Sequence, residues 1–286
     1  GMDSFSINAA LFAASVAVGL VVARSTEVPK VTTKAAPKPR KANVMKLPTT
    51  GDINIADYID HTVLKPSTVL SDIEKLCKEA VQYKFAAVCV PPNFVRAARK
   101  ILDAAASKVQ VATVIGFPFG YSNIAAKVAE VEQAIEDGAD ELDMVANISS
   151  IKSHDWVFLR QEVEAVLKPI RAHGLVLKVI IESGILLDHE IIGCCEVYGA
   201  AGIDYLKTST GYAEAGASEK AVSLFRAHLP MSVQIKASGG IRDYATALAM
   251  VRCGATRIGC SAGVAIVSSS KTGASAATAP AAGSAY

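Results

Sequence analysis

The stretch AAKVAEVEQAIEDGADELDMV, residues 125–145, joins a helix to a strand within one short segment. Apolar residues such as Val131 and Ile135 recur with the 3.6-residue period of a helix, and Gly138 supplies the expected stop. The residues that follow, 141–145, form a run of strand length. The segment therefore predicts one helix-to-strand step of an α/β fold.

The same alternation of short apolar runs and amphipathic stretches extends from about residue 55 to residue 267. Eight repeats of this pattern favour a closed, parallel (β/α)8 barrel, the TIM-barrel architecture. The main alternative is a doubly wound open sheet, which usually shows a glycine-rich turn after its first strand; here that turn contains Pro66 and Ser67. The predicted strands are Tyr58–Thr62, Ala87–Val90, Val111–Ile115, Glu141–Val145, Leu177–Ile181, Tyr205–Lys207, Val233–Lys236 and Arg257–Gly259.

The segment SDIEKLCKEAVQYKF, which starts at Ser71, carries a local signal for a helix start. Ser71 is placed to cap the helix, and Glu74 follows three residues later, as in a capping box. We therefore predict that Ser71 caps this helix.

The two ends of the chain differ in composition from the predicted barrel at 51–267. Residues 1–50 form an extension in which an apolar run at 7–23 precedes a basic stretch, and residues 268–286 form a tail rich in Ser, Ala and Gly. The apolar run is near the lower length limit for spanning a bilayer. Two interpretations stay open: a segment for organelle import or membrane contact, and an added extension on a cytoplasmic enzyme.

Composition argues against two classes of partner. The formal net charge is +2, and because the extension is basic, the predicted barrel is slightly acidic. It therefore lacks the basic footprint of a nucleic-acid-binding protein. The 6 cysteines form no Cys-x-x-Cys pair, and the 5 histidines show no metal-ligand spacing. We therefore predict no metal site and no nucleic-acid partner.

Two lysines end apolar strands of the predicted barrel, where active-site groups of this architecture lie. They are Lys207 in DYLKTSTG and Lys236 in VQIKASGG. If both side chains point into one mouth, repulsion and desolvation favour the neutral amine, which can attack a carbonyl carbon and form a Schiff base. The alternative is that each lysine forms a salt bridge with Asp143 or Glu182 at neighbouring strand ends.

Glycine-rich loops follow the last two predicted strands. One contains Gly239 and Gly240, and the other runs from Gly259 through Ser261 to Gly263. Phosphate sites in barrels of this kind often form in these two loops, because exposed backbone N–H groups and a helix N-terminus can surround the anion. The position of the two loops predicts a phosphorylated ligand.

Segments throughout residues 55–267 resemble deoxyribose-phosphate aldolases, above all GIDYLKTSTGY (202–212) and IKASGGIRDYATAL (235–248). The resemblance implies reversible cleavage of 2-deoxy-D-ribose 5-phosphate to acetaldehyde and D-glyceraldehyde 3-phosphate. It implies that Lys207 forms the Schiff base and that no cofactor beyond this covalent link is used. The implied partners are a small phosphorylated sugar and aldehydes, and the implied assembly is a homo-oligomer in the cytoplasm.

The resemblance also assigns roles to the other residues of the site. Lys236 lowers the pKa of Lys207, Asp143 moves protons through a water, and Asp60 lies near the substrate. The C-terminal Tyr286 is similar to a mobile tail tyrosine that helps to protonate the enamine in some members of the family. The residues implied in substrate or phosphate binding are Thr210, Gly211, Gly239, Gly240, Gly259 and Ser261.

Departures from the family pattern leave alternatives open. Tyr212 stands where some members carry a lysine near the phosphate, and Ala262 stands where a second serine is common. One alternative is a Schiff-base aldolase of the same fold with a different aldehyde pair. The other is a catalytically idle barrel that serves as a binding or scaffold protein.

Overall fold

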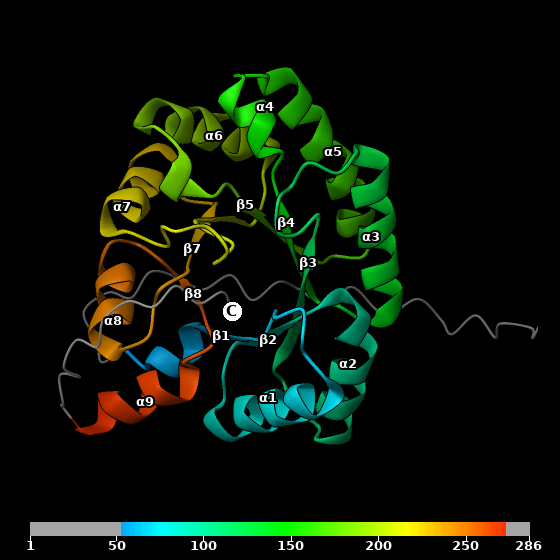
Figure 1. Cartoon of the computed structure of the whole chain (residues 1–286), viewed down its shortest axis with the longest axis vertical. Helices are drawn as coiled ribbons and strands as arrows, with labels where there is room; N and C mark the ends of the chain where they lie inside the picture. The colour runs from blue at the N-terminus through cyan, green and yellow to red at the C-terminus, as the bar shows by residue number, and fades with distance from the viewer. Residues whose placement is uncertain (1–52, 273–286) are drawn as a thin grey trace, which may run out of the picture. The chain divides into compact units, whose positions relative to one another are not determined.

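The computed structural model describes residues 53–272, in which eight parallel strands close into a barrel (Figure 1). Each strand pairs with the next along the chain, and β8 pairs with β1, so the predicted (β/α)8 fold is confirmed. The strands are β1 (Ile59–Thr62), β2 (Ala87–Val90), β3 (Gln110–Ile115), β4 (Glu141–Val145), β5 (Val176–Ile180), β6 (Tyr205–Lys207), β7 (Gln234–Ser238) and β8 (Arg257–Cys260).

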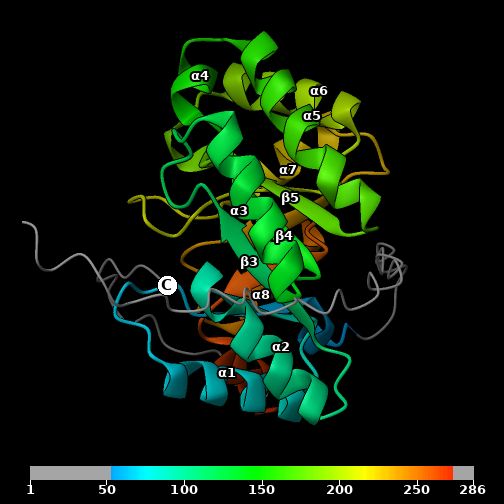
Figure 2. The same ribbon diagram turned by 90° about the vertical axis from the view of Figure 1, so that its right-hand side faces the viewer.

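Helices surround the strands in chain order, and each packs against its neighbours (Figures 1 and 2). The α-helices are α1 (Leu70–Tyr83), α2 (Val95–Ala104), α3 (Ile124–Asp137), α4 (Ile148–Lys152), α5 (Trp156–Ala172), α6 (Asp188–Ala201), α7 (Glu219–His228), α8 (Tyr244–Arg252) and α9 (Gly263–Thr272). Three short 3-10 helices are η1 (Ile55–Tyr58), η2 (Pro92–Phe94) and η3 (Ser183–Ile185).

The segment at 125–145 folds as its sequence predicts. Helix α3 buries Val131 and Ala134 against the barrel and ends at Gly138, which has φ 97°. A left-handed residue at this position lets the chain turn sharply into the next strand, and glycine adopts it without a Cβ penalty. All five residues of β4 are buried, which places the carboxylates of this strand inside the protein.

The predicted start of α1 is wrong by two residues. Val69, not Ser71, is the N-cap residue, and Ser71 lies inside the first turn. The carboxylate of Asp72 accepts a hydrogen bond of 2.9 Å from the Val69 N–H. Asp72 stands three residues after Val69 and forms the acidic half of a capping box. This box marks a helix start at Val69 and not at Ser71.

The predicted extension at 1–50, its apolar run at 7–23 and most of the predicted tail at 268–286 lie outside the described residues. Helix α9 continues to Thr272, past the predicted end of the barrel. Within residues 53–272, no helix combines the length and the apolar character that crossing a membrane requires.

Candidate active site

Strand register brings the polar residues of the barrel together. Lys207 of β6 is paired with Lys236 of β7, and Asp143 of β4 is paired with Lys178 of β5. Paired residues of neighbouring parallel strands point to the same side of the sheet. All four side chains are buried inside the barrel, where Asp60 of β1 joins them.

Asp143 is the centre of this cluster. Its Oδ2 accepts hydrogen bonds from Lys207 Nζ at 2.9 Å and from Lys236 Nζ at 2.8 Å, and its Oδ1 accepts one from Lys178 Nζ at 2.7 Å. Lys236 Nζ also lies 2.5 Å from Asp60 Oδ2. The structure thus brings Lys207, Lys236, Asp143 and Asp60 into one connected network.

Three charged residues of the network were not identified from the sequence. Glu141 Oε2 lies 2.6 Å from Lys178 Nζ, and Arg257 donates to both Glu141 Oε2 at 2.8 Å and Asp60 Oδ1 at 2.7 Å. Lys178 also lies within an apolar strand, but it does not end that strand as Lys207 and Lys236 do. Arg257 and Glu141 each begin a predicted strand, where a charged residue is commonly solvated.

The network contains one more basic residue than acidic residues. Because buried charges are stable only when they are paired, the surplus positive charge disfavours protonation of one of the lysines. The basic residues are Lys178, Lys207, Lys236 and Arg257, and the acidic residues are Asp60, Glu141 and Asp143.

The pKa shifts identify Lys207 as the lysine that loses its proton most easily. Burial lowers the pKa of Lys207, Asp143 opposes this shift and the Lys236 ammonium adds to it. Burial also acts on Lys236, but Asp143 and Asp60 hold the pKa of Lys236 well above its usual value. Burial would raise the pKa of Asp143, yet the three lysines hold it well below its usual value. The result is an anionic Asp143, a cationic Lys236 and a less basic Lys207.

The geometry combines features of both interpretations offered for the two lysines. The amines do share one site, as the Schiff-base hypothesis requires, and they also pair with Asp143, as the salt-bridge alternative proposed. Glu182 has a different partner: its carboxylate accepts hydrogen bonds from the Thr210 hydroxyl and, at 3.2 Å, from the Thr210 N–H. Burial raises the pKa of Glu182. The Thr210 hydroxyl is thus engaged within the protein, where it also accepts from the Tyr212 N–H at 3.0 Å.

The glycines of the mouth allow close backbone approach. Gly239 and Gly240 have φ of 89° and 79°, and Gly211 has φ 88°. A Cβ on Gly239 would lie 3.0 Å from the Cα of Gly216, so the loops after β6 and β7 come into close backbone contact there. Backbone N–H groups at such a place can approach an anion closely.

Gly259 and Ser261, the other predicted phosphate residues, have different environments. A Cβ on Gly259 would lie 2.9 Å from the Cε of Lys236, so glycine at this position of β8 leaves room for the lysine side chain. Ser261 is exposed just before α9. Gly259 therefore shapes the amine site, whereas Ser261 lies where a ligand can reach it.

Tyr212 links two loops at the mouth. Its hydroxyl donates a 2.8 Å hydrogen bond to the Leu64 carbonyl oxygen, and its ring packs edge-on against Phe117 with centroids 5.5 Å apart. Tyr286, the predicted tail residue of the site, lies outside the described residues.

The carboxylates of the barrel do not suit a metal ion. Both oxygens of each of Asp60, Glu141 and Asp143 accept hydrogen bonds from lysine or arginine, so a cation would have to displace these charges. The arrangement instead suits covalent chemistry at Lys207. A buried lysine of reduced basicity, beside a second lysine and an ionised aspartate inside a (β/α)8 barrel, defines a Schiff-base aldolase.

Comparison with known proteins agrees with this class. Residues 55–269 match a family described as DeoC/LacD family aldolase. A deoxyribose-phosphate aldolase of Thermococcus gammatolerans is 48% identical over 215 residues, which cover 75% of this chain and 96% of the relative. Deoxyribose-phosphate aldolase 1 of Bacillus licheniformis is 48% identical over 213 residues, 74% of this chain and 94% of the relative.

Solved structures show the same similarity. An aldolase named QR15 superposes with a TM-score of 0.73 at 38% identity and covers 77% of this chain and 97% of its own. The deoxyribose phosphate aldolase of Aeropyrum pernix is described as having a unique tetrameric structure. It superposes with a TM-score of 0.71 at 31% identity and covers 77% of this chain and 92% of its own. The chain belongs to the DeoC/LacD family of aldolases.

Proposed function

We propose that this protein cleaves 2-deoxy-D-ribose 5-phosphate reversibly to acetaldehyde and D-glyceraldehyde 3-phosphate through a Schiff base on Lys207. The relatives named deoxyribose-phosphate aldolase, which this chain matches over nearly their whole length, support the choice of substrate. The observation that carries the proposal is the surplus cation of the buried network, because it makes the Lys207 amine available as a nucleophile.

In the forward reaction the neutral amine of Lys207 attacks the C1 aldehyde carbon. The resulting carbinolamine loses its hydroxyl group as water and becomes an iminium ion. Lys236 holds its proton and is hydrogen-bonded to the same Asp143 oxygen, so it can supply the proton that this water takes away. No further cofactor is needed, because the iminium is the electron acceptor.

Cleavage then removes the proton of the C3 hydroxyl group, and we assign this step to Asp143 acting through a water. The C2–C3 bond breaks, its electron pair moves into the iminium to give an enamine, and glyceraldehyde 3-phosphate leaves with the new carbonyl at the former C3. Protonation of the enamine carbon and hydrolysis release acetaldehyde and restore Lys207.

Acetaldehyde carries the former C1 and C2, so the bond that breaks lies between C2 and C3, and the former C3 becomes the aldehyde carbon of glyceraldehyde 3-phosphate. The proton that Asp143 removes through the water is that of the hydroxyl group on this same C3.

We further propose that the phosphate binds beside Gly239 and Gly240, with Gly211 and Ser261 at the edge of the same site. Support comes from the left-handed glycine backbones and from the position of these loops after β6, β7 and β8. Tyr286 is proposed as a proton donor to the enamine. The A. pernix relative supports a homo-oligomer, and a cytoplasmic location is proposed over organelle import.

Trapping the Schiff base tests the proposal. Full-length protein is incubated with acetaldehyde and sodium borohydride, and its peptides are analysed by mass spectrometry. We expect an ethyl group on Lys207 and no such group on that peptide in Lys207→Leu. Lys75→Leu, a change at an exposed lysine, serves as the matched control and retains the adduct on Lys207. A folded wild-type protein without the adduct would be an idle barrel, and the proposal would be wrong.

A retro-aldol assay then identifies the substrate. We expect release of acetaldehyde from 2-deoxy-D-ribose 5-phosphate to exceed release of any aldehyde from other phosphorylated or unphosphorylated sugars. Faster cleavage of another sugar by an enzyme that still forms the Lys207 adduct would indicate a Schiff-base aldolase with a different aldehyde pair.

A further inference from the structure

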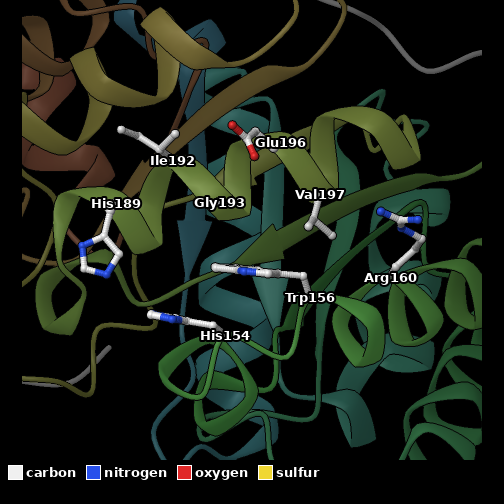
Figure 3. A pocket seen from close by; sticks show the side chains of 8 residues that line it. All are labelled: His154, Trp156, Arg160, His189, Ile192, Gly193, Glu196 and Val197. Carbon is white, nitrogen blue, oxygen red and sulfur yellow. The ribbon is translucent and has the colours of Figure 1, made fainter.

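A surface pocket of about 500 Å³ lies beside α5 and α6, in the helical layer outside the barrel (Figure 3). His154, in the turn before α5, stacks on Trp156 with ring centroids 5.7 Å apart and planes at 6°. His189, in the first turn of α6, meets His154 edge-on at 5.4 Å. Two imidazoles that are far apart in the sequence therefore lie together at this pocket.

Glu190 brings a carboxylate to the two imidazoles. One nitrogen or oxygen atom from each of His154, His189 and Glu190 lies within 4.8 Å of the others, and Glu190 Oε1 is 3.9 Å from His154 Nε2. Both histidines are exposed, whereas Glu190 is only 3% exposed. The site therefore has one fixed ligand and two that can turn toward a metal.

The orientation of Glu190 is set by contacts to its other oxygen. Oε2 accepts a 2.8 Å hydrogen bond from Lys152 Nζ and a 2.7 Å hydrogen bond from the Leu187 N–H. Partners of this kind commonly orient the ligands of metal sites.

We propose that His154, His189 and Glu190 bind one divalent transition-metal ion of the Zn²⁺ type. Two imidazoles and a carboxylate are the donors that Zn²⁺, Co²⁺ and Ni²⁺ accept, and three protein ligands leave a fourth position open. Zinc–ligand bonds of about 2.0–2.2 Å place ligand atoms closer together than 4.8 Å, so the exposed histidines rotate inward on binding. The bound ion connects the turn before α5 to the start of α6.

This site is separate in both chemistry and position from the reaction cluster, which is the network of buried charges around Asp143. Its ligands come from the α4–α5 turn and from α6, whereas the reaction cluster is made by residues of the barrel strands. The proposed ion takes no part in the Schiff-base reaction, which leaves its test independent of the aldolase assay.

Titration of metal-free, full-length protein with Zn²⁺ tests the proposal by calorimetry. We expect one site, and we expect His154→Ala and His189→Ala each to weaken it by more than about tenfold, since loss of even an outer partner commonly has such an effect. His228→Ala removes an exposed histidine at the end of α7 and is the matched control, with unchanged affinity.

Two further measurements use the same proteins. Zn²⁺ raises the melting temperature of the wild type and of His228→Ala but not of the double variant His154→Ala/His189→Ala. Co²⁺ gives the visible absorption of a site with nitrogen and oxygen ligands. Equal Zn²⁺ affinity in the wild type and the double variant, or a thiolate-to-cobalt band that reports binding at a cysteine, would overturn the proposal.

Discussion

Two groups of buried charges in this molecule differ in whether the charges balance. In the helical layer, Lys127 of α3 and Glu162 of α5 form a one-to-one pair at 2.6 Å, with both side chains fully buried. Lys127 also donates to the carbonyl oxygens of Gly120 at 2.6 Å and Val145 at 2.7 Å. Every hydrogen of this ammonium group has an acceptor, so the pair fixes the loop at Gly120 to the end of β4.

The reaction cluster in the barrel has four basic side chains and three acidic ones. Lys207 and Lys236 share the Oδ2 atom of Asp143, and only Lys236 has a second carboxylate, that of Asp60. The difference between the two groups shows how the same residue types serve two purposes. A balanced pair stabilises structure, whereas one surplus cation produces an amine that can react.

Replacing Lys207 tests the surplus cation and has the largest expected effect. Lys207→Leu removes the nucleophile and leaves three basic and three acidic residues in the cluster. We expect retro-aldol activity to fall by more than about 10⁴-fold, and the free energy of unfolding to change by less than about 1 kcal/mol. Steady-state assays and urea unfolding measure the two quantities. Strong destabilisation without loss of turnover would contradict the assignment.

Replacing Lys127 tests the balanced pair, and here the effect falls on stability. Lys127→Met leaves the Glu162 carboxylate buried without its cation, which is expected to lower the free energy of unfolding by about 3–5 kcal/mol. The double variant Lys127→Met/Glu162→Gln should recover part of this loss, because no buried charge remains. Urea unfolding of the single and double variants makes the comparison. A single variant as stable as the wild type would show that the pair does not stabilise this contact between the loop at Gly120 and β4.

Replacing Lys236 tests whether its positive charge lowers the pKa of Lys207, and the pH dependence of the reaction reports this pKa. Burial lowers the pKa of Lys207, Asp143 raises it and Lys236 lowers it further. With Lys236→Met the charges balance only when Lys207 is protonated, so the pKa of Lys207 rises. Because the attacking amine must be neutral, the acidic limb of kcat/KM against pH moves to higher pH. Activity at the optimum falls by about 10²–10⁴-fold if Lys236 also transfers protons. An acidic limb at the wild-type position would show that Lys236 does not control Lys207.

The fold was predictable because its signals are local. Helical periodicity and a glycine stop, as at Gly138, occur within a few residues of each other and repeat along the chain. The exact helix start at Val69 was not predicted, since Ser71 and Asp72 offer overlapping capping patterns and tertiary packing decides between them.

The site was only partly predictable because its charge balance depends on register. The sequence identified Lys207 and Lys236 as lysines at strand ends, but their pairing across β6 and β7 is a property of the closed barrel. Arg257 was missed because nothing local shows that its side chain faces inward. Lys178 was missed because it lies within an apolar strand but not at its end. The contact between His154 and His189 could not be predicted from the sequence either, because it depends on the packing of α5 against α6.

The smallest expected effect concerns the mouth, where no buried charge is involved. Tyr212→Phe removes the 2.8 Å hydrogen bond to the Leu64 carbonyl oxygen and keeps the ring against Phe117. We expect the free energy of unfolding to fall by about 0.5–1.5 kcal/mol. KM for the phosphorylated sugar should rise while kcat stays near the wild-type value, because the loops that shape the mouth loosen and the amine cluster beneath them is unchanged. Tyr121→Phe, a change at an exposed tyrosine, is the matched control. A lower kcat with unchanged KM would instead place the Tyr212 hydroxyl in the chemical step.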